Sequence, residues 1–143
     1  MLSADSLFSM QWLLGEIVSR VEHDAPARVW TLAFRSGASL SIPSLWRLLE
    51  ADKLTTTSED HGHTFGKLHP FDALAPLSAL QGKAVCAVAL SSGTSDLKLH
   101  FSPVVALEVI NTSAGFEGWH AVHPTLGSVF VACGGEMNAI QGA

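Results

Sequence analysis

The sequence predicts an α+β domain in which a helix followed by a five-stranded antiparallel meander occurs twice. Two observations lead to this prediction. The chain aligns with itself after a shift of 67 residues, and in each copy the hydrophobic period changes from helical to alternating after a glycine. We expect one domain, residues 1–143, made of two repeats (about 3–60 and 70–136) that a polar linker, 59–69, joins. Two similar sheets with matched apolar faces would pack about a pseudo-twofold axis.

The internal repeat needs no gap over residues 5–42, which align with residues 72–109. The aligned positions are those that the hydrophobic period sends to the core, together with one glycine and one aspartate. The matches are Asp5/Asp72, Leu7/Leu74, Leu13/Leu80, Gly15/Gly82, Val18/Val85, Val21/Val88, Leu32/Leu99, Phe34/Phe101, Leu40/Leu107 and, conservatively, Ile42/Val109. Equivalent residues are therefore expected to share one backbone path and to turn the same side chains inward.

Each repeat begins with a short segment of helical spacing. The first contains Leu7, Met10 and Leu14, after the N-cap residue types Ser3 and Asp5. The second follows the same plan, with apolar residues at helical spacing after a proline and an aspartate; its residues are Pro70, Asp72, Leu74, Leu77 and Leu80. The glycines that follow, Gly15 and Gly82, are expected to end the helices in the left-handed conformation.

After each glycine the alternation indicates three strands. They lie near residues 17–21, 30–34 and 40–42 in the first repeat, and near 84–90, 97–101 and 105–109 in the second. Gly37 is suited to the positive φ of a hairpin loop, and a three-residue loop in the second copy places Lys98 opposite Glu108 as an ion pair. A further hairpin is expected in each repeat, at 44–58 and at 116–133. Trp46 and Trp119 then occupy comparable places.

The composition limits the classes of function. Only 15% of the chain is charged and 48% is hydrophobic, which argues against disorder and favours an apolar surface for self-association as a homodimer. The net charge is −5 and the eight Lys and Arg residues are dispersed, so we expect neither nucleic acid nor a membrane as partner. No transmembrane run or secretory signal is recognised, which predicts a cytoplasmic protein. Cys86 and Cys133 are interpreted as buried free thiols rather than a disulfide.

The polar stretch 55–66 is the main candidate site. Its Glu59, Asp60, His61 and His63 are types that bind metals, and Asp60 with a histidine would suit acid–base chemistry. The alternative is a solvated linker in which Asp60 fixes a turn. Two histidines without a third spaced ligand form a weak metal signal, so no metal, cofactor or catalytic residue is assigned.

Aromatic and charged residues next to the two comparable tryptophans are the second candidate site. Trp46 with Arg47, and Glu117 with Trp119, are types enriched at protein-binding hot spots, whereas burial in the core is the alternative for both indoles. The candidate binding residues are thus Trp46, Arg47, Glu59, Asp60, His61, His63, Glu117 and Trp119.

Two motifs resemble a family of small, uncharacterised bacterial proteins. They are the TSEDHGxxFG motif of residues 57–66 and the SAGFEGW motif of residues 113–119. Some relatives in that family resemble immunity-type proteins, which neutralise a toxin by binding it. The resemblance implies a bacterial cytosolic protein and brings no catalytic residues.

The sequence therefore favours a non-enzymatic protein-interaction module that binds a protein partner, immunity-like in character and able to self-associate. The alternative is a small enzyme or a metal-dependent ligand binder that uses Asp60, His61 and His63 at the junction of the repeats.

Overall fold

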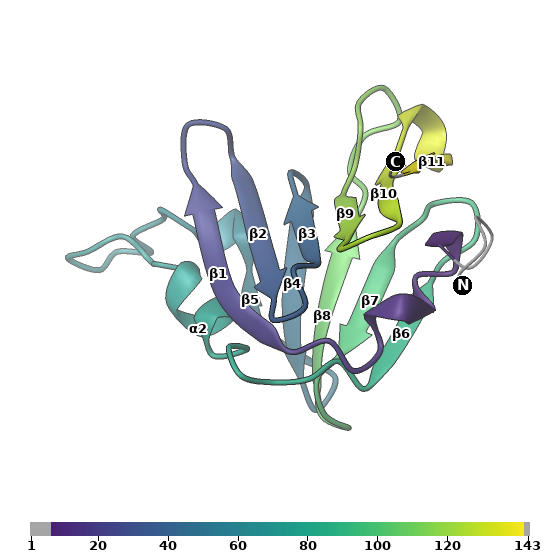
Figure 1. The fold of residues 1–143 in the computed structure, drawn as a ribbon. Coiled ribbons are helices and arrows are strands. Elements are labelled where there is room, and N and C mark those ends of the chain that lie inside the picture. The colour runs from purple at the N-terminus through teal and green to yellow at the C-terminus, as the bar shows by residue number, and fades with distance from the viewer. Residues whose placement is uncertain (1–6, 142–143) are drawn as a thin grey trace.

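The computed structural model describes residues 7–141 and is mostly β (Figure 1). Its described part contains eleven strands in two antiparallel sheets and one short α-helix, so the prediction of an α+β fold with two helices is wrong. Runs of helical spacing this short cannot stabilise a helix by themselves, because nucleation is costly and helices under about 12 residues are marginal. The strands, in contrast, are stabilised by hydrogen bonds to neighbouring strands in a sheet.

The first sheet has six strands in the order β1-β2-β3-β9-β10-β11. Their bounds are β1 (Val18–Asp24), β2 (Val29–Phe34), β3 (Ser39–Ile42), β9 (His120–His123), β10 (Gly127–Val131) and β11 (Met137–Gln141). The second sheet has five strands in the order β5-β4-β8-β7-β6. Their bounds are β4 (Leu45–Glu50), β5 (Lys53–Thr57), β6 (Ala87–Leu90), β7 (Leu97–His100) and β8 (Val105–Ile110).

The prediction of a five-stranded meander in each repeat is wrong, because neither run of five strands stays within one sheet. After three strands the chain crosses to the other sheet, so β3 pairs with β9 and β4 pairs with β8. Pro43 stands at the first crossing and cannot donate a hydrogen bond to continue a ladder. When β1–β5 are matched with β6–β10, the strand order of the two sheets is the same, and β11 is an additional edge strand.

Reciprocal hydrogen bonds join the starts of the two strand runs. The N–H of Gly15 donates to the carbonyl of Val85 (2.8 Å), and the N–H of Gly82 donates to the carbonyl of Val18 (2.7 Å). Each bond becomes the other when its residues are shifted by 67. Both glycines have the left-handed φ that the sequence predicts, +83° and +82°. Positive φ is inexpensive for glycine, which has no Cβ.

The core lies between the two sheets. Alternating burial in β2 and β7 turns Leu32, Phe34 and Leu99 inward, and Phe101 directly after β7 is buried as well. Each buried aliphatic or aromatic side chain of this kind contributes roughly 1.5–3 kcal/mol relative to an exposed one. The predicted inward positions of the second strand in each run are therefore confirmed.

The expected helices are short turns. The first prediction lies partly outside the described residues, as do its caps Ser3 and Asp5; within them, residues 7–8 are helical and a 3₁₀ helix, η1 (Gln11–Leu13), follows. The second is α2 (Leu74–Ser78), which packs against β1. No helix in the described part of the chain is long and apolar enough to cross a membrane.

Several local predictions are confirmed and two are corrected. Gly37 has φ +97° in its hairpin, and Lys98 lies opposite Glu108. The ion pair of Glu108, however, is with Arg47, whose Nη2 lies 2.7 Å from Oε1. Cys86 is exposed and free, so its interpretation as a buried thiol is wrong; the side chain of Cys133 lies outside the described part.

Candidate functional site

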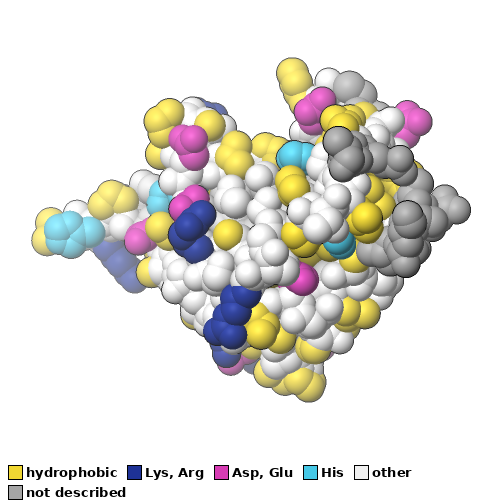
Figure 2. All heavy atoms as spheres, in the orientation of Figure 1, with side chains coloured by type: hydrophobic (Ala, Val, Ile, Leu, Met, Phe, Trp, Pro, Cys, Tyr) yellow, Lys and Arg dark blue, Asp and Glu magenta, His cyan; other side chains and the backbone are white. Residues whose placement is uncertain are grey.

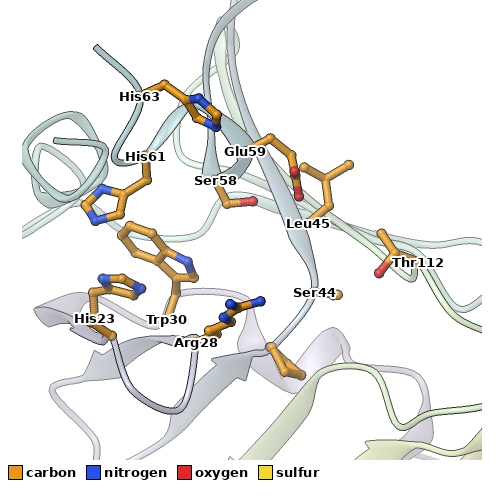
Figure 3. A pocket seen from close by; sticks show the side chains of 12 residues that line it. His23, Arg28, Trp30, Ser44, Leu45, Ser58, Glu59, His61, His63 and Thr112 are labelled. Carbon is orange, nitrogen blue, oxygen red and sulfur yellow. The ribbon is translucent and has the colours of Figure 1, made fainter. Parts of the chain in front are cut away.

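A cleft of about 600 Å³ opens where the β1–β2 turn, the β3–β4 crossing and the segment after β5 meet (Figure 3). That segment begins with a 3₁₀ helix, η2 (Ser58–Asp60), which the side chain of Thr57 caps by accepting the N–H of Glu59. The cleft is lined by His23, Ala25, Arg28, Trp30, Pro43, Ser44, Leu45, Ser58, Glu59, His61, His63 and Thr112.

One wall of the cleft is a cluster of aromatic rings. His23 lies directly opposite Trp30 in the β1–β2 register and stacks on it, with centroids 3.8 Å apart and planes 18° apart. His61 meets both rings edge-on, at 4.8 Å from His23 and 5.0 Å from Trp30. Trp46 closes the cluster from the core, edge-on to Trp30 at 5.2 Å. The rings therefore tie the segment after β5 to the first sheet.

His61 is also held by the backbone that leads into α2. Its Nδ1 accepts the N–H of Ala73 at 3.1 Å, so the neutral ring carries its proton on Nε2. The carboxylate of Asp72 lies 3.9 Å from the same Nδ1. Burial lowers the pKa of His23, and the nearby His61 lowers it further, against smaller opposing effects of Asp24 and Asp72. The cluster thus favours a neutral His23.

Three polar groups of the cleft lack partners in the described part of the protein. Arg28 and Glu59 both line the cleft, and neither has an oppositely charged group within 4.0 Å there. The hydroxyl of Ser44 is buried without a hydrogen bond. Figure 3 shows Arg28 and Ser44 on one side of the cleft and Glu59 and His63 on the other. A polar ligand would meet hydrogen-bonding groups from both sides.

The structure brings together only part of the first predicted site. Glu59, His61 and His63 line the cleft, whereas Asp60 lies beside them in η2 without lining it. Among the residues that the structure describes, no three His, Cys, Asp or Glu side chains are placed to hold a metal ion. Sequence analysis missed His23 and Arg28, because their position depends on a pairing between strands that no local motif signals.

The second predicted site does not form. Trp46 and Trp119 are both 0% exposed, so burial in the core is the correct interpretation and neither indole is a surface anchor. Arg47 is engaged with Glu108, and Glu117 lies on an exposed loop that does not line the cleft.

A loop that projects next to the cleft adds a feature that the sequence did not predict. This projecting loop, residues 62–70, is closed at its base by two backbone bonds, Gly62 N–H to Phe71 O (2.9 Å) and Phe71 N–H to His63 O (2.7 Å). It carries Phe65 (63% exposed) and Leu68 (89% exposed). Figure 1 shows it extending from the body of the domain, and Figure 2 shows apolar and histidine side chains at its end.

Comparison with protein-family models, with curated proteins and with solved structures finds no match to this chain. The resemblance to a bacterial family therefore stays a prediction, and the geometry of the cleft and of the projecting loop is the basis for the function.

Proposed function

We propose that the protein is a non-enzymatic interaction module of the cytoplasm that binds a protein partner through the projecting loop and the adjoining cleft. The observation that carries this proposal is the exposure of Phe65 and Leu68 at the end of a loop whose base is closed by backbone hydrogen bonds. Large apolar side chains held out in water cost free energy, and a partner surface that covers them recovers it.

The loop is built to present these side chains rather than to lie on the domain. Phe65 and Gly66 both have positive φ, +49° and +76°, and the N–H of Lys67 donates to the carbonyl of Thr64 at 2.8 Å. A turn defined in this way loses less conformational entropy on binding than a free chain. The ring of His63 lies 5.8 Å from that of Phe65 and supports it from the base of the loop.

The proposed partner is a different protein. A stable complex of standard size buries roughly 800 Å² on each partner, which two side chains on a narrow loop do not supply, so the interface includes more than the end of the loop. A partner that also enters the cleft reaches a larger area. A monomer in size-exclusion chromatography with light scattering is expected for the isolated protein, and a dimer that the loop variants below disrupt would contradict this assignment.

Site-specific photo-crosslinking in source cells tests the function. A photoreactive phenylalanine analogue replaces Phe65 in one variant and Leu54 in the control, since Leu54 is also exposed (53%) but lies on β5. We expect one protein to be crosslinked from position 65 and not from position 54. A Leu68→Ser substitution should reduce that crosslink severalfold. The proposal is rejected if position 65 yields only the protein itself, or the same products as position 54.

A further inference from the structure

Two equivalent positions of the fold differ in how their polar groups are satisfied. Arg28 and Ser95 are 67 residues apart. Arg28 directly precedes β2, and Ser95 lies two residues before the equivalent strand β7. Both have the left-handed backbone that side chains other than glycine rarely adopt, with φ +56° and +59°. Ser44 and Asn111 correspond in the same way, because they follow β3 and β8. The second position therefore serves as an internal reference for the first.

At the second position, around Ser95 and Asn111, most of the side-chain donors form hydrogen bonds with acceptors of the chain itself. The indole N–H of Trp119 donates to the carbonyl of Ser95 at 2.7 Å, and the hydroxyl of Ser95 donates to the carbonyl of Gly135 at 2.6 Å. The side-chain amide of Asn111 donates to the carbonyl of Thr94 at 2.5 Å, although its Oδ1 has no partner among the residues that the structure describes. All three acceptors are peptide carbonyls, and the cavity that remains there is about 260 Å³.

At the first position the equivalent donors have no acceptor. Trp46 is the equivalent of Trp119, because Trp46 lies opposite Val109 and Trp119 lies next to the strand pair that contains Ile42, 67 residues before Val109. The indole N–H of Trp46 is buried and has no hydrogen bond in the described structure. The Ser44 hydroxyl is likewise buried and unpaired, and the cleft is more than twice as large, at about 600 Å³. A buried donor without an acceptor costs free energy, so each such group calls for an explanation. Of these two groups only Ser44 lines the cleft, while Trp46 lies behind Trp30, which does line it.

We propose that the cleft binds a peptide segment of the partner that carries a carboxylate. This inference rests on the proposed function, since it names the chemistry of the partner. A peptide is indicated because carbonyls of the chain itself meet the equivalent donors at the second position. A carboxylate is indicated because the residue equivalent to Ser95 is Arg28. Its guanidinium can bind a carboxylate with two parallel hydrogen bonds.

The other groups of the cleft fit such a segment. Arg28 is the only Arg or Lys among the described residues that line the cleft, so the place of the carboxylate is defined. Glu59 lies across the cleft from Arg28 and accepts N–H donors of the segment (Figure 3). The hydroxyl of Ser44, on the side of Arg28, donates to a peptide carbonyl.

Nuclear magnetic resonance of the indole N–H signals tests the inference without the partner. The signals of Trp46 and Trp119 are assigned with Trp46→Phe and Trp119→Phe, and the protein is titrated with acetyl-Gly-Asp-Gly-amide. We expect a saturable shift of the Trp46 signal and no shift of the Trp119 signal. The matched probe acetyl-Gly-Asn-Gly-amide should bind about tenfold more weakly, because it cannot form the charge-assisted pair.

An arginine variant and its control locate the carboxylate. Arg28→Gln should remove the preference for the Asp probe, whereas Arg20→Gln, on the exposed part of β1 where Arg20 pairs with Glu22, should retain it. Equal binding of both probes, the same shifts with acetate alone, or equal shifts of Trp46 and Trp119 would overturn the inference. A negative titration with a positive crosslink at Phe65 rejects only the cleft inference, and the reverse result rejects the role of the loop.

Discussion

Replacing each equivalent tryptophan by phenylalanine separates the contribution of one hydrogen bond from that of packing. Trp46 and Trp119 are both fully buried, so each substitution removes the same atoms from the same kind of environment. Only Trp119 donates a hydrogen bond, to Ser95 O at 2.7 Å, whereas the indole N–H of Trp46 has no acceptor in the described structure. Trp119→Phe leaves a buried carbonyl unpaired, and Trp46→Phe removes a donor that was already unpaired.

The expected difference follows from these partners. An unpaired buried group costs about 1–3 kcal/mol, while the loss of packing is common to both variants and largely cancels. Phenylalanine retains a ring, so the edge-on contact of Trp46 with Trp30 persists in part. We therefore expect Trp119→Phe to be less stable than Trp46→Phe by about 2 kcal/mol. For a urea dependence of about 2 kcal/mol per molar, the midpoints differ by about 1 M.

Urea unfolding followed by circular dichroism and by fluorescence measures this difference. The two probes must give the same transition, since a free energy is defined only for two-state unfolding. Near-ultraviolet circular dichroism of both variants checks that the native packing is kept. The reasoning is refuted if Trp46→Phe is as destabilising as Trp119→Phe, or more so, because the unpaired indole would then hold a partner that the geometry does not contain.

Two further predictions concern Gly135, which accepts the hydrogen bond of Ser95, and His23, which stacks on Trp30. Gly135→Ala should lower the free energy of unfolding clearly more than Gly134→Ala. Both glycines have positive φ (+78° and +75°), so either substitution adds about 1–2 kcal/mol of backbone strain. Only at Gly135 would the new Cβ also lie 2.7 Å from the carbonyl oxygen of Gly93. Equal urea midpoints for these variants would contradict the close approach. Because the pKa of His23 is lowered in the folded protein, the unfolded chain binds more protons than the folded one at mildly acidic pH. His23 therefore makes the free energy of unfolding fall as the pH drops below 6.5, the ordinary pKa of histidine, and on through the lower pKa of the folded state. His23→Gln should flatten the change in urea midpoint between pH 7.5 and pH 5.5, and an unchanged slope would show that His23 is not its source.

Local features were accessible from the sequence because they depend on neighbours along the chain. The alternation of Leu32 and Phe34 with polar or small residues placed β2 and its inner face, and Gly37 marked a hairpin turn. The register of Lys98 against Glu108 followed from the length of one loop. Helical spacing misled, since a few apolar residues three or four apart are compatible with turns that pack on a sheet.

The sequence by itself determined most of the strands, the inward faces of β2 and β7 and the turn at Gly37, since period and backbone preference act over a few residues. It did not predict β11, whose place was decided by its pairing with β10. Tertiary structure alone decided which sheet each strand joins, through the crossings that pair β3 with β9 and β4 with β8. It also decided the cleft, where His23 and His61 meet although they are 38 positions apart in the chain. Such contacts depend on how whole strands cross between the sheets, and no short stretch of residues encodes that.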